Sequence, residues 1–330
     1  MMRSGVILSI YLFEGRMAVI CYDSPVNPNG VQAKQPCVLV LGFFDGVHLA
    51  HQHIINSAKK LAIQENMQLA VMTFFPHPKE VLDPREIQRP CMTPLSLKIK
   101  IFEQMKVDAL YVIRFDKEFS SLAPAQFVSD FILPLNPKHI VAGFDFTYGK
   151  YGRGNMDSLR DHTMGQVNIV TIEKLERHGQ KIGSTLIRQL IQSGKVDRVP
   201  DYLGDYYTIH GSVSPSQSKF FSFKVKISEN YMFPHSGLYQ IAWHQDEYEV
   251  NASCLIDADS PAPKCLVKLP DKFMFPPAYG SEITVKFITK INGIYEMTWN
   301  HAETSGLIHL SPTSNWRRDD LGKTANYGKS

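Results

Sequence analysis

The chain has 330 residues, 44% of them hydrophobic, and its 35 Lys and Arg residues outnumber its 32 Asp and Glu residues by a net charge of +3. This length allows about two domains of roughly 100–200 residues each, and the hydrophobic fraction excludes an intrinsically disordered protein. So small a charge surplus gives no reason to expect nucleic acid or an anionic membrane as the partner. The five cysteines are scattered, without close pairs, which excludes a secreted disulfide framework or a zinc ribbon and predicts reduced thiols in the cytoplasm.

The N-terminal segment has an apolar stretch too short for a membrane span or a clear signal peptide. Residues 6–13 are apolar, but Glu14 and Arg16 follow at once, and residues 23–36 are rich in Pro, Asn and Gly. We therefore expect residues 1–35 to be a lead-in, either a short strand or a variable segment, that ends in a loop.

Residues 36–204 alternate between short apolar runs and segments with the apolar spacing of helices. The continuous run at residues 37–41 is typical of a strand buried on both faces of a parallel sheet. Further strands are expected at 69–75, 109–114, 139–142 and 167–172, and helices at 53–65, 94–105, 124–133 and 184–193. This alternation predicts βαβ units and an α/β, Rossmann-like, doubly wound domain, which binds nucleotides at the carboxyl ends of its strands.

After about residue 204 the pattern changes to strands separated by turns rich in Pro, Gly, Ser and Asn. Strands are expected at 206–213, 220–227, 238–243, 247–252, 265–269 and 282–290. Segments with helical spacing are lacking, so a small antiparallel β-barrel is predicted over residues 205–310, followed by a polar tail at 311–330.

Residues 42–51, GFFDGVHLAH, lead from the first buried strand into the first helix. Two glycines, Gly42 and Gly46, let the backbone turn tightly and approach a ligand closely. The helix N-terminus that follows offers unpaired N–H groups and a positive dipole end, which suit a phosphate. His48 and His51 are three residues apart and share one face of a helical first turn, where imidazoles can donate hydrogen bonds to a phosphate as charge develops during transfer.

Three further segments accompany this one. Residues 42–51 are similar to the H-x-G-H signature of nucleotidyltransferases, and residues 73–78 (TFFPHP) fit T-F-x-P-H-P. Residues 143–149 (GFDFTYG) fit G-x-[ND]-F-x-[FY]-G, and residues 183–188 (GSTLIR) are close to S-S-T-x-I-R. In this order the four motifs resemble those of the bacterial bifunctional riboflavin kinase/FAD synthetase family, a far more specific signal than H-x-x-H alone.

The resemblance implies an enzyme that transfers AMP from ATP to FMN, giving FAD and pyrophosphate, with Mg²⁺ as cofactor and no covalent intermediate. It implies catalytic roles for His48, His51 and Arg188. It implies nucleotide contacts from eight more residues: Gly42, Phe43, Phe44, Asp45, Gly46, Lys181, Ser184 and Thr185. Contacts near the flavin phosphate or the metal would come from His77, Pro78, Asp145 and Phe146. The metal ligands and the oligomeric state stay open.

The chain departs from the family pattern at several places. Ala50 replaces the glycine of H-x-G-H, and Gly183 replaces the first serine of S-S-T. The second domain keeps segments similar to the family's riboflavin-kinase barrel, at 233–239 and 278–280, but residues 210–223 lack the P-T-A-N sequence that would hold Mg-ATP. We therefore expect a degenerate kinase-like barrel without riboflavin kinase activity, whose role is structural or regulatory.

Other interpretations remain open at this point. His48 and His51 are also compatible with helix capping and packing or with metal ligation, Asp45 with a turn cap, His77 with a rigid loop and Arg188 with a solvated helix position. For the whole protein, the alternatives are a catalytically weakened regulatory protein that binds flavin or nucleotide, and a nucleotidyltransferase that acts on another phosphate acceptor.

Overall fold

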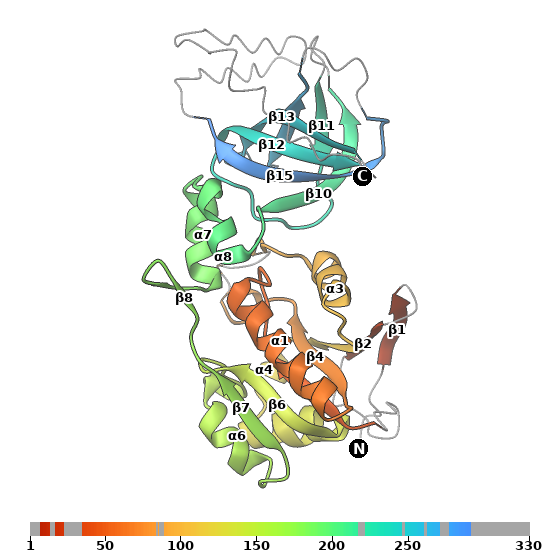
Figure 1. The fold of residues 1–330 in the computed structure, drawn as a ribbon, viewed down its shortest axis with the longest axis vertical. Helices are drawn as coiled ribbons and strands as arrows, with labels where there is room; N and C mark the ends of the chain where they lie inside the picture. The colour runs from red at the N-terminus through yellow and green to blue at the C-terminus, as the bar shows by residue number, and fades with distance from the viewer. Residues whose placement is uncertain are drawn as a thin grey trace, which may run out of the picture.

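The computed structural model describes residues 7–13, 17–22, 35–83, 85, 89–216, 222–245, 248–260, 263–270 and 277–291. The predicted tail at 311–330 and residues 217–221, part of the segment 210–223 expected to be a degenerate kinase loop, lie outside this part of the chain. Figure 1 shows a helix-flanked sheet and a barrel, with the helices α7 (Ser184–Gln192) and α8 (Pro200–Leu203) between them.

The first part is built on a seven-stranded sheet with the order β1-β2-β5-β4-β3-β6-β7. Its strands are β1 (Ile7–Phe13), β2 (Met17–Tyr22), β3 (Cys37–Leu41), β4 (Gln68–Phe75), β5 (Ala109–Arg114), β6 (Pro137–Gly143) and β7 (Asn168–Ile172). All neighbours pair in parallel except β1 and β2, which are antiparallel. The chain moves from β3 to β4 on one side and later to β6 on the other, so the order reverses at β3. The sheet also includes residues of the segment 1–35 that was expected to be a lead-in.

Helices cover both faces of this sheet, because successive side chains of a strand point to opposite faces. In β3, Cys37, Leu39 and Leu41 join one core and Val38 and Val40 the other. The helical segments of this part are α1 (Leu49–Gln64), α2 (Pro78–Leu82), α3 (Leu95–Gln104), α4 (Lys117–Ser120), α5 (Pro124–Phe127), the π-helical turn η2 (Val128–Ile132), the 3₁₀ turns η3 (Leu133–Leu135) and η4 (Lys150–Gly152), and α6 (Met156–His162). Helices α1 and α3 pack on one face, and α5, η2 and α6 on the other.

Two helices differ in extent from the prediction. Helix α1 begins at Leu49, four residues before the expected position, because His48 caps its N-terminus. The helix expected at 124–133 is regular only to Phe127 and continues as π and 3₁₀ turns, with Pro134 lacking the N–H that an α-helix needs there.

The second part is a closed antiparallel barrel with the strand order β10-β11-β14-β13-β12-β15. Its strands are β10 (Thr208–Pro215), β11 (Ser222–Lys226), β12 (Gly237–Gln245), β13 (Tyr248–Asp257), β14 (Lys264–Lys268) and β15 (Glu282–Lys290). Alternate residues point inward, as in β10, where Ile209 and Val213 are buried. The predicted architecture, a Rossmann-like domain followed by a small antiparallel barrel, is confirmed.

A short connection joins the two parts. It contains the two-stranded ribbon β8 (Glu176–Arg177) and β9 (Gln180–Lys181), then α7, the 3₁₀ turn η5 (Val196–Arg198) and α8. Ile187 and Ile191 of α7 are fully buried in the core of the barrel, and the Ile191 carbonyl accepts a hydrogen bond from the backbone N–H of His235 at 3.2 Å. The connection is therefore packed as part of the barrel rather than as a free linker.

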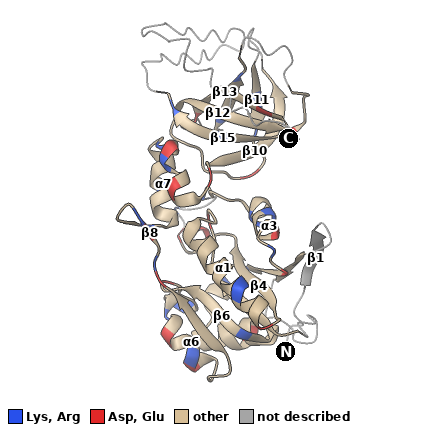
Figure 2. Ribbon diagram, in the orientation of Figure 1, with Lys and Arg blue, Asp and Glu red and all other residues tan. Residues whose placement is uncertain are grey.

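Acidic and basic residues are interspersed over both parts in Figure 2, as on α3 and α6. This distribution agrees with the small net charge of +3. Among the described residues, every helix is too short or too polar to cross a membrane.

Candidate active site

The loop between β3 and α1 has an unusual backbone. Phe44, Gly46 and Val47 all have positive φ, of 57°, 91° and 41°. A Cβ atom on Gly42 would lie 2.5 Å from the Phe44 ring, so only glycine at this position lets the ring fold back beside the strand. Residues other than glycine adopt positive φ at a cost of about 1–3 kcal/mol each, and such conformations cluster at functional sites.

His48 and His51 lie together at the N-terminus of α1. Nδ1 of His48 accepts a hydrogen bond from the His51 backbone N–H at 3.3 Å, and the two rings stack with centroids 3.6 Å apart. Burial lowers the pKa of His48 to about 4 and that of His51 well below its usual value. A neutral imidazole that accepts at Nδ1 carries its proton on Nε2, so His48 has a donor to offer a ligand. Within the described part of the chain, the buried Nδ1 of His51 has no partner.

The T-F-F-P-H-P motif lies beside this loop. The His77 ring contacts the Phe43 ring edge-on, with centroids 4.1 Å apart. Nδ1 of His77 accepts from the Lys79 N–H at 3.0 Å, which caps the short helix α2 that begins at Pro78. Burial lowers the pKa of His77 to about 4. His77 is thus a third neutral imidazole and, like His48, carries its proton on Nε2.

Asp45 is the centre of the hydrogen-bond network, and its side chain is 2% exposed. One carboxylate oxygen accepts from the backbone N–H groups of Met92 and Thr93, at 2.9 and 3.3 Å. The other accepts from Nη2 and Nε of Arg188, at 2.6 and 3.1 Å. Its backbone carbonyl accepts from the Ser184 hydroxyl at 2.8 Å. Asp45 therefore connects three parts of the chain: the loop before the N-terminus of α1, the segment before α3, and helix α7.

Helix α7 presents its N-terminus to this network. Gly183 is its N-cap and supplies no side-chain hydrogen bond, so the first N–H groups, those of Ser184 and Thr185 among them, lack an intrahelical partner. Thr185 is exposed and Ser184 half-buried. The Arg188 guanidinium, expected to meet phosphate, is engaged by Asp45 in this structure.

The segment after β6 supplies the remaining predicted residues. The Asp145 carboxylate is exposed and pairs with Lys181 Nζ at 2.6 Å. The same ammonium lies 4.6 Å from the centre of the exposed Phe144 ring. Phe146 is half-buried and stacks on Tyr148, 6.0 Å away. The 143–149 motif thus supplies a carboxylate and aromatic rings, and Lys181 of β9 adds an ammonium beside them.

The two departures from the family pattern are accommodated without strain. A Cβ atom on Gly183 would meet nothing within 4 Å, and its φ of −171° is extended backbone that any residue adopts. Ala50 lies in the first turn of α1 and packs against the core of the barrel.

Sequence reasoning missed Lys98, Thr73 and the backbone of Met92 and Thr93. The Lys98 ammonium donates to the Phe43 carbonyl at 2.7 Å and lies 4.4 Å from the centre of the Phe43 ring. Thr73 donates to the same carbonyl at 3.0 Å. Lys98 precedes Phe102 by one helical turn, so a lysine in the apolar stripe of its helix was the available signal. No sequence signal indicated the backbone donors.

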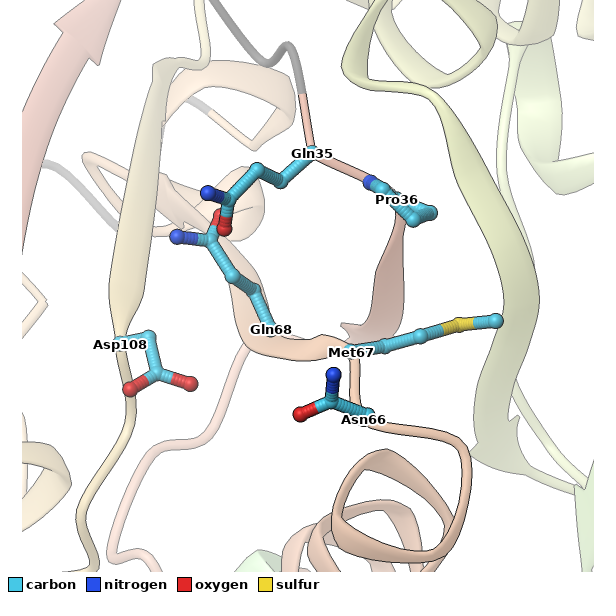
Figure 3. A pocket seen from close by; sticks show the side chains of 6 residues that line it. All are labelled: Gln35, Pro36, Asn66, Met67, Gln68 and Asp108. Carbon is cyan, nitrogen blue, oxygen red and sulfur yellow. The ribbon is translucent and has the colours of Figure 1, made fainter.

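The loops that hold Asp45, His77 and Asp145 follow the carboxyl ends of β3, β4 and β6. The strand order reverses at β3, and doubly wound folds bind nucleotides at such a point. A separate hollow of about 370 Å³ lies at the amino ends of β3, β4 and β5 (Figure 3). It is lined by Gln35, Pro36, Asn66, Met67, Gln68 and Asp108. Because it opens at the opposite edge of the sheet, it is not part of this site.

The described residues include no cluster of three or more His, Cys, Asp or Glu side chains placed to hold a metal ion. This donor set does not suit zinc, which takes three or four protein ligands. It is compatible with Mg²⁺, which commonly binds through one or two carboxylates and the phosphates of its substrate. Asp145 supplies an exposed carboxylate in the segment after β6.

Comparison with known proteins agrees with the geometry of the site. The FAD synthetase family model matches residues 31–186. The chain is 37% identical over 286 residues to the bifunctional riboflavin kinase/FMN adenylyltransferase of Bacillus subtilis, a match that covers 81% of this chain and 89% of the relative. It is 32% identical over 204 residues to a FAD synthetase of Listeria monocytogenes, covering 62% of this chain and 80% of that protein.

A solved structure extends the likeness to the barrel. The structure of a macrolide-efflux protein from Streptococcus pneumoniae superposes with a TM-score of 0.75 at 24% identity, over 85% of this chain and 93% of the other, a likeness of fold alone. The extent of the match to the Bacillus protein, through both the sheet and the barrel, decides the family. The chain belongs to the bifunctional riboflavin kinase/FMN adenylyltransferase family, and the prediction of a nucleotidyltransferase enzyme is confirmed.

Proposed function

We propose that the protein transfers the adenylyl group of ATP to FMN, giving FAD and pyrophosphate, and that it does not phosphorylate riboflavin. A phosphate oxygen of FMN attacks the α-phosphorus of ATP in line, the bond to the β-phosphate oxygen breaks and pyrophosphate leaves. The protein has only to position two phosphate groups and stabilise the charge that develops between them.

The observation that supports this proposal best is the hydrogen bond of 2.8 Å between the Ser184 hydroxyl and the Asp45 carbonyl. It joins the loop before α1 to the first residue of α7, so the proposal places the N-terminal N–H groups and positive dipole ends of both helices at the triphosphate. Such an arrangement suits a triphosphate, which carries several negative charges in a short length.

The side chains take complementary roles in the proposal. His48 and His51 hold the triphosphate and stabilise the transition state through hydrogen bonds. The N–H groups at Ser184 and Thr185 bind phosphate from the other side, and Lys181 supplies a positive charge. Arg188 acts through Asp45, which it holds in place, rather than on phosphate directly.

The remaining predicted residues complete the proposed substrate site. The loop of Gly42, Phe43, Phe44 and Gly46 brings backbone close to the nucleotide, while His77, Pro78 and Phe146 lie on the side of FMN. Mg²⁺ would be held by the substrate phosphates and the Asp145 carboxylate, and when bound it would neutralise charge on the departing pyrophosphate. Asp145 would then have to exchange Lys181 for the cation.

The absence of kinase activity is proposed from the barrel. Residues 210–223 lack P-T-A-N, and Phe223 is fully buried against Trp243, with ring centroids 5.8 Å apart. A buried aromatic side chain offers no group to bind phosphate.

Incubation of the purified protein with Mg-ATP and either FMN or riboflavin, followed by chromatography of the flavins, tests both statements. We expect FMN to become FAD and riboflavin to remain unchanged. His48→Ala and His51→Ala are each expected to lower kcat by about 10²–10³-fold, the usual effect of removing a donor to the transition state. Absence of FAD in the wild-type reaction would disprove the transferase, and formation of FMN from riboflavin would disprove the loss of kinase activity.

The departures at Ala50 and Gly183 favour one second candidate, a regulatory protein that binds flavin or nucleotide without turnover. Calorimetry of flavin binding, together with a measurement of pyrophosphate release, separates the two functions. Binding of FMN or FAD with no pyrophosphate released would select the regulator, whereas pyrophosphate released only when FMN is present would select the enzyme.

A further inference from the structure

Lys98 is a buried cation beside the proposed site. It lies on the same face of α3 as Phe102, one helical turn before it, and is 4% exposed. Phe102 packs edge-on against Phe44, with centroids 5.6 Å apart, while the Lys98 ammonium contacts the carbonyl and the ring of Phe43. One face of α3 thus holds both aromatic residues of the β3–α1 loop.

The burial of this lysine is not explained by an ion pair. Lysine is almost never fully buried unless it is paired. Within the described part of the chain Lys98 forms no ion pair, and its polar contact is the Phe43 carbonyl. Asp45 is a nearby carboxylate, but its oxygens are taken by Met92, Thr93 and Arg188. Since an uncompensated buried charge is costly, its retention points to a function.

Two consequences of its position can be read from the contacts. Lys98 and Thr73 donate to the same carbonyl, that of Phe43, at 2.7 and 3.0 Å, immediately before the strained Phe44. Each of the two rings that α3 holds also contacts an imidazole: Phe43 contacts His77 and Phe44 contacts His51, at 4.1 and 5.1 Å. The Lys98 ammonium therefore contacts the ring that touches His77, and Phe102 of the same helix contacts the ring that touches His51.

We propose that Lys98 is a positioning residue for adenylyl transfer: it fixes the Phe43 carbonyl, and its positive charge adds to burial in keeping the imidazoles of His51 and His77 neutral as they face phosphate. This role rests on the proposed function. Lys98 need not touch the substrate, because its effect passes through the loop and the two rings.

The electrostatics of the neighbouring groups agree with the geometry. Burial is the main cause of the low pKa of His51, and the charges of His48 and Lys98 lower it further. Burial also lowers the pKa of His77 to about 4; Asp45 opposes this change, while Arg89, Arg188 and Lys98 reinforce it. Burial lowers the pKa of Lys98 itself to about 8, against the effects of Asp45 and Cys91, so the ammonium is mainly protonated at pH 7.

The test compares Lys98→Met, similar in length but uncharged, with Lys100→Met, which removes an exposed lysine from the same helix. Histidine pKa values are measured by NMR titration of the full chain, and FAD formation is followed in parallel. For Lys98→Met we expect higher pKa values for His51 and His77, a kcat lower by roughly ten- to a hundredfold, and an acidic limb of the kcat–pH profile shifted to higher pH. Lys100→Met is expected to leave all three unchanged.

Thr73→Val separates the two parts of the role, because it removes the second donor to the Phe43 carbonyl and leaves the charge in place. For Thr73→Val we expect a lower kcat with unchanged histidine pKa values. Lys98→Arg keeps the charge and should keep the pKa values of His51 and His77. These two variants test the proposal if Lys98→Met does not fold. Unchanged pKa values in folded Lys98→Met, displaced values in folded Lys98→Arg, or full kcat in Thr73→Val would overturn the proposal. The titrations do not depend on FAD formation, so failure of the proposed function would be recognised separately.

Discussion

At the scale of single residues, Asp45 shows how one buried side chain organises a site. Its carboxylate and carbonyl together accept five hydrogen bonds, from Met92, Thr93, Ser184 and twice from Arg188. The Arg188 side chain is 11% exposed and that of Asp45 2%. Their pair is thus shielded from solvent, and removal of one partner leaves a buried charge uncompensated.

Asp45→Asn is therefore expected to lower the free energy of unfolding by about 3–5 kcal/mol, the usual cost of breaking a buried ion pair from one side. The measurement is urea unfolding at pH 7. Asp83→Asn is the matched control, because Asp83 pairs with Arg85 at the protein surface and its loss should leave stability unchanged. Equal stability of the Asp45 and Asp83 variants would contradict a structural role for Asp45.

The neutral histidines make stability dependent on pH. The folded-state pKa values of His48 and His77, about 4, lie below the ordinary value of 6.5, so the folded protein binds fewer protons than the unfolded chain between these values. Their contribution to stability is complete above about pH 6.5 and is lost as the pH falls toward 4.

We expect the free energy of unfolding to fall between pH 6.5 and pH 4, and to fall less steeply in His77→Gln. Urea unfolding at half-unit steps of pH provides the measurement. The same slope in the wild-type and variant proteins would show that His77 is not held neutral by the fold.

At the scale of secondary-structure elements, the N-terminal ends of α1 and α7 reach the site in different ways. The first is held by a strained loop with positive φ at Phe44, Gly46 and Val47. The second begins at Gly183 in extended backbone with open space around it. Only the second should tolerate a larger side chain.

Gly183→Ser is expected to fold normally and to lower the KM for ATP a few-fold, because the added hydroxyl can contact phosphate at the helix mouth. Gly46→Ser is the matched control: its φ of 91° and the Met92 side chain 2.9 Å from the new Cβ should destabilise the protein by about 1–3 kcal/mol. Steady-state kinetics and thermal unfolding of both variants check this. A rise in KM in Gly183→Ser would show that the space is not available to the nucleotide.

At the scale of the whole molecule, the site and the barrel share contacts. The Cys91 N–H donates to the Asn230 carbonyl, and the Met232 N–H donates to the Cys91 carbonyl, both at 2.9 Å. The residues next to Cys91, Met92 and Thr93, donate to Asp45. The barrel thus supports the segment that holds Asp45.

Because Met92, Ile187 and Ile191 belong to the core of the barrel, we expect the sheet and the barrel to unfold in a single transition. Calorimetry should give equal calorimetric and van't Hoff enthalpies. Ile187→Ala, in a fully buried position, should lower the stability of the whole by about 2–5 kcal/mol. Two separate transitions would show that the parts are independent.

The architecture and the segments that form the site could be predicted from the amino-acid sequence. Apolar runs and helical spacing are local properties, so the five strands at 37–41, 69–75, 109–114, 139–142 and 167–172 and the six strands of the barrel could be located to within a few residues. The four motifs placed His48, His77, Asp145 and Ser184 after the correct elements, since glycines and helix caps act within a few residues of themselves.

The contacts that these residues make could not be predicted from the sequence, because they form between elements that are distant along the chain. The pairing of Arg188 with Asp45, across 143 positions of sequence, depends on how α7 packs against the β3–α1 loop, and the burial of Lys98 depends on where α3 meets Phe43. The same is true of β2, whose place in the sheet requires β5 beside it. Long-range contacts follow from the packing of whole elements. A local sequence pattern does not indicate which other element will pack against it.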